Sequence, residues 1–368
     1  MNDSPEDTTA RPRWLLPTPA RRDEPQGEAA PLRALLLRLM RGEDLRRAEA
    51  AALLDALLDG AATDAQIAAA LVALAVKGET VEELSGMAAA MRGRAVRLAS
   101  RHARFIDTAG TGSSGAKTFN VSTAAAFVVA GAGLPVAKHG SRAATSRSGS
   151  ADVLTALGVN VSVAPEVSER CLNETGICFM FAPLYHGATA RVAGVRRELG
   201  VHTTFNLLGP LTNPAGAPRQ IIGVWHRALV EPLARALLEL GTERAWVVHG
   251  LDGLDEVTLA DKTLIAEARG DADVRAFEIA PEDFGQERAT LEGLRGGDAA
   301  ANARIIREVL DGKRRDAARA LVVVNAAAAL LVGGAAENLK DGARLASDSI
   351  DTGAARAKLE QLARATNA

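Results

Sequence analysis

Aromatic side chains are scarce in this sequence, at 3% of its 368 residues. Proteins that bind single-stranded nucleic acid stack bases on clusters of such side chains, so this scarcity argues against that class. The net charge of −2 argues against a general nucleic-acid binder as well, because such proteins carry a basic excess. We therefore expect no nucleic-acid partner.

Cysteines are also few, and long apolar runs are missing. Cys171 and Cys178 lie seven positions apart, with no second pair to complete a metal site. They are expected to be buried or partly buried thiols in a reducing compartment, without a disulfide or zinc. No run of 18 apolar residues is present, and the first residues have no apolar signal core. The sequence therefore predicts a cytoplasmic protein with no membrane partner.

The N-terminal quarter divides into a tail and a helical part. Residues 1–29 mix Pro, Arg, Asp and Glu without periodicity, which is typical of a flexible tail. Apolar residues at helical spacing then predict four short helices between residues 31 and 97, the third capped by Thr63 and the fourth by Thr80. We predict an α-helical domain over residues 30–98, joined by a helical segment at 186–200.

The remainder, residues 99–368, is predicted to be a larger α/β domain. Short apolar runs suited to buried strands alternate with helix-length segments, at 105–108, 134–137, 177–181, 221–224 and 245–248. Such alternation predicts βαβ units and a mostly parallel central sheet. Ligands of such sheets bind beyond the carboxyl ends of the strands, where the polar segments below are expected to meet.

A glycine-rich segment at residues 107–123 follows the first of these strands. Its glycines let the backbone approach a ligand closely, and a helix predicted over residues 121–131 directs its free N–H groups and positive dipole end at the loop. Asn120, Ser122 and Thr123 add polar side chains at that helix start. The spacing matches neither the dinucleotide motif nor the P-loop. The segment suits a phosphate group; a capped turn with glycines for geometry alone is the alternative.

Two further polar segments follow strands. Residues 138–150 place Lys138, Arg142 and Arg147 among hydroxyl side chains on a predicted loop, which suits phosphate, although a polar surface loop is the alternative. Asp252, Asp255 and Glu256 follow another strand and suit Mg²⁺, although an acidic turn would look the same. On a helix predicted over 186–199, Arg196 and Arg197 cannot both face inward, so at most one contacts a ligand. Residues 205–214 are interpreted as a structural, proline-containing turn.

Taken in this order, these segments resemble the anthranilate phosphoribosyltransferase family. The resemblance spans about residues 31–362 and rests on residues 107–112, 118–123, 138–142, 148–154, 205–214 and 252–256. It implies the fold shared with pyrimidine nucleoside phosphorylases, a small helical domain beside a larger α/β domain. It also implies transfer of phosphoribose from phosphoribosyl pyrophosphate to anthranilate, with release of pyrophosphate, in tryptophan biosynthesis. A homodimer formed through the helical domain is implied too.

The resemblance also assigns residues to three parts of a site. Anthranilate is expected at Gly110, Ser141 and Arg196, and Mg²⁺ at Ser122, Asp255 and Glu256. Lys138 and Mg²⁺ would stabilise charge, with no residue expected to act as an acid or base. The residues expected to bind phosphoribosyl pyrophosphate are Ser113, Ser114, Thr118, Asn120, Val121, Ser122, Thr123, Lys138, His139, Gly140, Ser141, Arg142, Ala143, Ala144, Thr145, Ser146 and Ser150.

The sequence departs from the family pattern at two positions. Ser114 stands where the family has an acid, and Ser141 where it usually has Asn. Both replacements are small and polar, which suits a retained site. Two alternatives are weighed against the enzyme: a nucleoside phosphorylase of the same fold, disfavoured because the loop after Lys138 lacks that family's glycine-rich pattern, and a non-catalytic relative that binds nucleic acid, disfavoured by the near-neutral charge.

Overall fold

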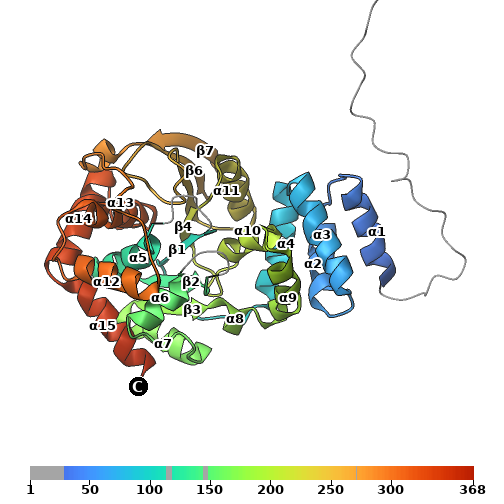
Figure 1. Ribbon diagram of the computed structural model, residues 1–368, viewed down its shortest axis with the longest axis horizontal. Coiled ribbons are helices and arrows are strands. Elements are labelled where there is room, and N and C mark those ends of the chain that lie inside the picture. The colour runs from blue at the N-terminus through green and yellow to red at the C-terminus, as the bar shows by residue number, and fades with distance from the viewer. Residues whose placement is uncertain (1–28, 113–117, 144–147, 271) are drawn as a thin grey trace, which may run out of the picture.

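A computed structural model describes residues 29–112, 118–143, 148–270 and 272–368. The predicted tail therefore falls almost wholly outside the described residues. Four helices come first: α1 (Ala29–Met40), α2 (Arg47–Leu58), α3 (Asp64–Lys77) and α4 (Val81–Arg94). The predicted caps are confirmed, since the Thr63 and Thr80 side chains accept hydrogen bonds from the N–H groups of Gln66 and Glu83. Figure 1 shows this bundle beside the larger α/β part.

The larger part is built on one seven-stranded sheet, in the order β3-β2-β1-β4-β5-β6-β7. The strands are β1 (Ile106–Gly110), β2 (Val136–Gly140), β3 (Ile177–Phe181), β4 (Arg219–Gly223), β5 (Arg244–Gly250), β6 (Thr263–Arg269) and β7 (Ala272–Ile279). β1 to β5 pair in parallel, which confirms the mostly parallel sheet, and β6 and β7 add an antiparallel edge that the sequence did not predict. The strand order reverses between β1 and β4, so a ligand site is expected beyond these two strands.

Helices cover both faces of this sheet (Figure 1). The first half of the α/β part contains α5 (Val121–Gly131), α6 (Ser150–Ala156), α7 (Pro165–Thr175), α8 (Ala182–Tyr185), α9 (Ala190–Leu199), α10 (Thr204–Leu211) and α11 (Val230–Glu239). The C-terminal part contains α12 (Ala299–Leu310), α13 (Ala317–Val332), α14 (Leu339–Asp351) and α15 (Ala354–Thr366). Among the described residues, no helix combines the length and apolar character needed to cross a bilayer.

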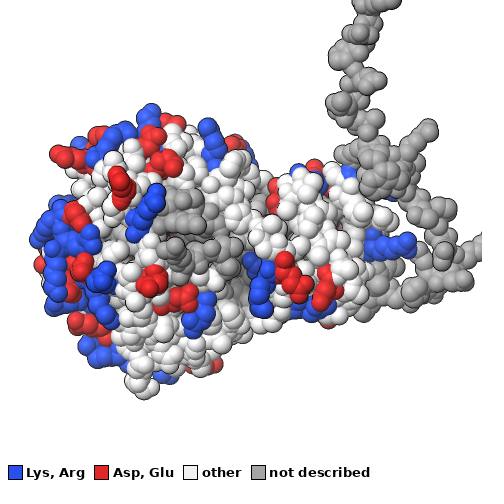
Figure 2. Space-filling view, in the orientation of Figure 1, with Lys and Arg blue, Asp and Glu red and all other residues white. Residues whose placement is uncertain are grey.

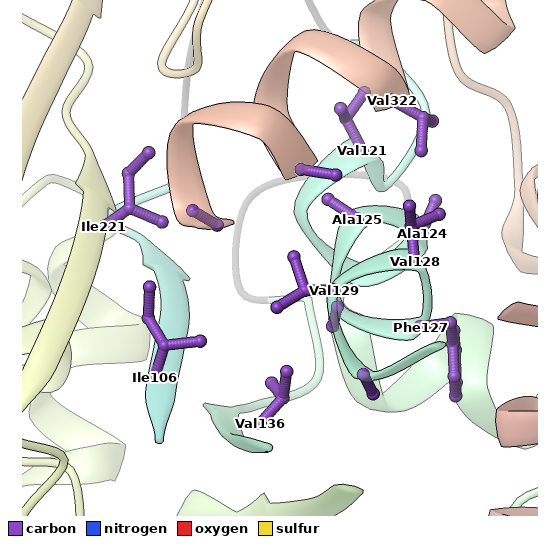
Figure 3. Packing of buried hydrophobic residues seen from close by; sticks show 14 of the residues in the cluster. Ile106, Val121, Ala124, Ala125, Phe127, Val128, Val129, Val136, Ile221 and Val322 are labelled. Carbon is purple, nitrogen blue, oxygen red and sulfur yellow. The ribbon is translucent and has the colours of Figure 1, made fainter. Parts of the chain in front are cut away.

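Helix α5 is almost wholly apolar after its first turn, and nearly all of it is buried. Figure 3 shows Val129 facing Ile106 of β1 and Val136 of β2, while Val322 of α13 packs near Val121. A helix enclosed in this way cannot shift easily, so its N-terminus is held firmly at the end of β1.

Two of the local predictions were wrong. Residues 186–189 do not extend a helix back to His186; a short 3-10 turn precedes α9. Residues 205–214 are not a turn, because α10 runs through most of them with Pro210 in its last turn. Cys171 and Cys178 are both free thiols, and the prediction that they are buried is confirmed.

Candidate active site

A cavity of about 990 Å³ opens at the carboxyl ends of β1 and β2. Its wall includes Gly110, the start of α5, the residues after β2, parts of α9 and α10, and the acidic pair Asp255 and Glu256. The polar segments predicted to meet beyond the strands therefore do meet.

The start of α5 forms one wall of the cavity. Thr118, Asn120, Ser122 and Thr123 line it, and the Thr123 hydroxyl is buried without a hydrogen-bond partner among the described residues. Val121 differs from its neighbours, because its side chain lies in the core. The hydroxyl groups and the helix start suit a phosphate group. Ser113 and Ser114 lie outside the described residues.

Lys138 lies beneath this wall, within β2 instead of on the loop predicted after it. Its Nζ donates to the Thr108 carbonyl and lies 3.4 Å from the hydroxyl oxygens of Thr108 and Ser122. Burial lowers the pKa of Lys138, and the charges of Asp107 and Glu256 oppose that shift. The ammonium group is thus held at the base of the cavity.

Asp107 is a buried structural partner that the sequence did not single out for a role. Its carboxylate accepts hydrogen bonds from the His139 N–H at 3.2 Å and the Asn213 side chain at 2.7 Å. Burial raises the pKa of Asp107 to about 6, although Lys138 and Asn213 act in the opposite direction. Asp107 therefore fixes β2, and with it Lys138, against β1.

The residues after Lys138 form the second wall. His139, Gly140, Ser141, Arg142, Ala143 and Ser150 all line the cavity, while Ala144, Thr145 and Ser146 lie outside the described residues, as does Arg147. A Cβ atom on Gly140 would collide with the Ser150 hydroxyl, so this backbone must pass very close to the start of α6.

Asp152, on α6, organises this wall. Its carboxylate accepts hydrogen bonds from the N–H groups of Ala143 and Gly149 and from the Arg142 guanidinium, each at 2.9 Å. Partial burial acts to raise the pKa of Asp152, but these three donors together lower it below its usual value. Arg142 is thus already paired, although it lines the cavity.

The acidic pair and Ser122 are arranged as a cation site requires. Glu256 accepts a hydrogen bond from the Ser122 N–H at 3.2 Å through one oxygen, and its other oxygen is buried without a partner among the described residues. Burial raises the pKa of Glu256 well above its usual value, and the adjacent Asp255 adds to that shift. Gly223 has no room for a Cβ because the Asp255 backbone lies on it. A buried, unpaired carboxylate oxygen beside a second carboxylate fits Mg²⁺.

The described residues contain no group of three or more His, Cys, Asp or Glu side chains able to hold a metal ion. Such a cation would need further oxygen ligands from substrate and water, as Mg²⁺ bound to phosphates usually has. Asp252, in the same loop, accepts hydrogen bonds from the Leu254 N–H and the Thr258 hydroxyl and holds the turn.

A less polar part of the cavity lies around Arg196. The guanidinium carbon of Arg196 is 5.2 Å from the centre of the Phe205 ring, and its Nε is buried without a partner among the described residues. Arg197 is exposed, and Arg191 pairs with Asp64 at 2.6 Å, so of these three arginines only Arg196 lines the cavity. Burial lowers the pKa of Arg196, but an arginine remains charged at neutral pH.

Two buried histidines lie in the same part. The rings of His139 and His186 are 5.1 Å apart, and burial lowers the pKa of His139 to about 3 and that of His186 to about 4. Both rings are neutral at pH 7, so this part combines flat, uncharged rings with the Arg196 cation. That combination suits an aromatic carboxylate.

Comparison with known proteins agrees with this geometry. Residues 102–356 match the glycosyl transferase family, a/b domain, and residues 33–95 match the helical bundle domain of the same family. Anthranilate phosphoribosyltransferase of Moorella thermoacetica is 52% identical over 331 residues, covering 90% of this chain and 97% of the relative. The chain belongs to the anthranilate phosphoribosyltransferase family.

Solved structures of anthranilate phosphoribosyltransferases share the whole fold. The Thermus thermophilus enzyme is 40% identical, with a TM-score of 0.85, covering 91% of this chain and 99% of the other. The Saccharomyces cerevisiae enzyme in complex with PRPP and Mg is 28% identical, with a TM-score of 0.84, covering 93% and 99%.

Several residues of this cavity were not predicted from the sequence. These residues come from distant parts of the sequence and reach the cavity only in the folded chain. They include Met91, Ala182, His186, His202, Phe205, Asn206, Gly209, Arg295, Gly296, Gly297 and Asn302. The glycine pair at 296–297 was the one available signal, because paired glycines often mark a close backbone approach.

Proposed function

We propose that this protein transfers the phosphoribosyl group of phosphoribosyl pyrophosphate to the amine of anthranilate. The products are pyrophosphate and N-(5-phosphoribosyl)anthranilate, an intermediate of tryptophan biosynthesis. The observation that carries the proposal is the cavity itself, which joins a phosphate-binding part to an aromatic, cationic part in a chain of this family.

The donor belongs at the start of α5 and along residues 138–143 and Ser150. Hydroxyl groups and the N-terminus of α5 would bind its phosphates, with the Lys138 ammonium beneath them. Mg²⁺ would be held by Ser122, Asp255 and Glu256, and when bound it supplies charge neutralisation that makes pyrophosphate a better leaving group. Lys138 would add a positive charge near Ser122, one of the proposed Mg²⁺ ligands.

Anthranilate belongs beside Gly110, Ser141 and Arg196. The Arg196 guanidinium would pair with its carboxylate, and neutral His139 and His186 would face its ring. Bond formation joins the amine nitrogen to the ribose carbon as the bond to pyrophosphate breaks. An aromatic amine is already a nucleophile, so the chain mainly holds the reactants in position and stabilises developing charge.

A homodimer and a cytoplasmic location are part of the proposal. Val72 and Val76 on α3 are 43% and 82% exposed, and apolar side chains of that size on one helix face suit contact with a second copy. Domain boundaries at residues 29 and 98 are proposed as predicted from the sequence.

The direct test is a fluorescence assay of anthranilate consumption with phosphoribosyl pyrophosphate and Mg²⁺. Turnover is expected only when all three are present. Lack of turnover with the complete mixture would contradict the proposal. Salt-dependent binding to DNA in a shift assay would instead favour a non-catalytic nucleic-acid binder, which the interspersed basic and acidic side chains on the face in Figure 2 do not suggest.

A further inference from the structure

Residues 294–297 lie across the start of α5, although they come from a distant part of the chain. Arg295 forms an antiparallel bridge with Thr118, and the Phe119 N–H donates to the Leu294 carbonyl at 3.3 Å. A Cβ atom on Gly296 would come within 2.6 Å of the Thr118 carbonyl oxygen. The two backbones are therefore in direct contact where the phosphate-binding wall begins.

Asn302, on α12, forms hydrogen bonds with both residues 294–297 and the start of α5. Its side-chain oxygen accepts from the Gly297 N–H at 2.7 Å, and its side-chain nitrogen donates to the Asn120 oxygen at 3.0 Å. Asn302 is only 3% exposed, so these bonds form away from bulk water and hold both partners firmly. Residues 294–297 are thus a fixed part of the wall.

Arg295 is an exposed residue of this wall, and it lines the cavity. Arg295 has no ion pair or side-chain hydrogen bond to any other described residue. The other cations described there have contacts: Lys138 with Thr108, Arg142 with Asp152, and Arg196 with the Phe205 ring, although the Arg196 Nε has no hydrogen-bond partner among the described residues. A donor that carries a phosphate and a pyrophosphate brings several negative charges to this place.

We propose that Arg295 binds a phosphate group of the donor, so that residues 294–297 form a third wall of the donor site. The inference rests on the proposed function, because it assigns a contact to that function's own substrate. Arg295 uses its backbone to bridge Thr118, which leaves the whole guanidinium available for a charge-assisted, two-pronged contact with phosphate oxygens.

The test compares Arg295→Ala and Arg295→Lys with Arg304→Ala in steady-state assays. Arg304 is an exposed arginine on α12 outside the cavity, so its variant controls for loss of one nearby charge. Arg295→Ala is expected to raise the KM for phosphoribosyl pyrophosphate by about tenfold or more, while the KM for anthranilate stays unchanged. Arg295→Lys should recover part of the loss, and Arg304→Ala should match the wild type.

Calorimetric titration with Mg²⁺ and phosphoribosyl pyrophosphate, without anthranilate, measures the same contact apart from turnover. The Arg295→Ala protein should bind this ligand more weakly while keeping the wild-type unfolding midpoint. A donor KM and affinity equal to those of Arg304→Ala, or a change in the anthranilate KM alone, would overturn the inference. An inactive wild-type protein would instead overturn the proposed function.

Discussion

The proposed Mg²⁺ ligands Asp255 and Glu256 allow a direct test at the scale of single residues, because the proposal assigns both carboxylates to one cation. Replacing both with Ala should lower the Mg²⁺-dependent rate by roughly a hundredfold or more, because charge neutralisation at the leaving group is lost. The measurement is initial rate against Mg²⁺ concentration. Asp261→Ala, which removes a half-exposed acid outside the cavity, is the control. Wild-type activity in the double variant would show that the metal is held elsewhere.

Arg196 and Arg197 form a natural pair for testing the acceptor part. Arg196 lines the cavity and Arg197 is exposed, so the two variants differ mainly in whether a cavity cation is lost. Arg196→Ala should raise the KM for anthranilate by about tenfold, more than it raises the KM for the donor, because a charged hydrogen bond is lost. Arg197→Ala should change neither. A larger effect on the KM for phosphoribosyl pyrophosphate would show that Arg196 binds the donor instead of anthranilate.

The raised pKa of Asp107 predicts that the free energy of unfolding depends on pH. Its pKa is raised by burial from 3.8 to about 6, so the folded protein holds this proton more tightly than the unfolded chain does. The stabilising contribution is therefore complete below pH 3.8 and is lost as the pH rises through 6, a change of about 3 kcal/mol.

Urea unfolding of the wild type and Asp107→Asn between pH 4 and 7 tests this expectation. The variant cannot titrate at this position, so its stability relative to the wild type should increase by about 2 kcal/mol as the pH rises from 4 to 7. Titrating groups that do not interact with Asp107 are common to both proteins and cancel in the difference. A difference that does not change with pH would contradict the shifted pKa of Asp107.

At the scale of elements, local patterns predicted most of the central sheet. Apolar runs located β1 to β5 because buried parallel strands are apolar on both faces. The edge strand β7 was missed since nearly all of it is exposed or half-buried, and it carries no such run. Helix α10 was missed because Gly209 and Pro210 favour a turn, whereas burial of Phe205, Leu207 and Leu208 favours the helix.

Some residues of the candidate site could be predicted from local sequence patterns, whereas others depend on partners far away in the sequence. The start of α5, Lys138 and the acidic pair could be found because each lies in a short, unusual segment at or beyond the end of a strand. Asn213 and Asn302 could not be found, because their partners Asp107 and Asn120 lie 106 and 182 positions away. Only folding brings such pairs together, and either asparagine could equally belong to a solvated surface.

Asn325, on α13, is a third asparagine whose partner is distant in sequence. We predict that it positions the loop that contains the acidic pair. Its side chain accepts from the Val257 N–H at 3.0 Å and donates to the Val257 carbonyl at 2.9 Å, next to Glu256. Asn325→Leu would leave both buried backbone groups unpaired, at a cost of about 1–3 kcal/mol, and free the acidic loop.

The expected result for Asn325→Leu is a several-fold increase in the Mg²⁺ concentration that gives half-maximal rate. Val324→Ala is the control, because it truncates a fully buried side chain of the same helix and keeps Asn325, which makes the hydrogen bonds to Val257. An equal Mg²⁺ requirement in both variants would show that Asn325 contributes only to stability.

At the scale of the whole molecule, the bundle and the sheet share one hydrophobic cluster. Leu53, Leu71 and Met87 of the bundle belong to the same cluster as Val224 and Val247 of the sheet region. Polar contacts join the parts as well: the Thr204 hydroxyl donates to Glu79 at 2.5 Å, and Arg92 donates to the Leu211 carbonyl at 2.7 Å. Neither part encloses its apolar surface alone.

A fragment of residues 99–368 is therefore expected to lack cooperative unfolding and to bind a hydrophobic dye. Circular dichroism during heating and dye fluorescence would measure both properties. A chain that begins at residue 29 is the control, since it keeps the bundle and should unfold as the full chain does. Cooperative unfolding of the 99–368 fragment would show that the α/β part is independent.

The order of the strands also has a consequence for synthesis of the chain. Ile106 of β1 pairs with Arg219 of β4, and the cavity wall is complete only with Asn302. A ribosome adds roughly 5–20 residues per second, so β1 pairs early with β2 but waits several seconds for β4 on its other side. Nascent chains that stop before Asn302 have no complete donor site. Binding of substrate can therefore stabilise this protein only after most of its length has been synthesised.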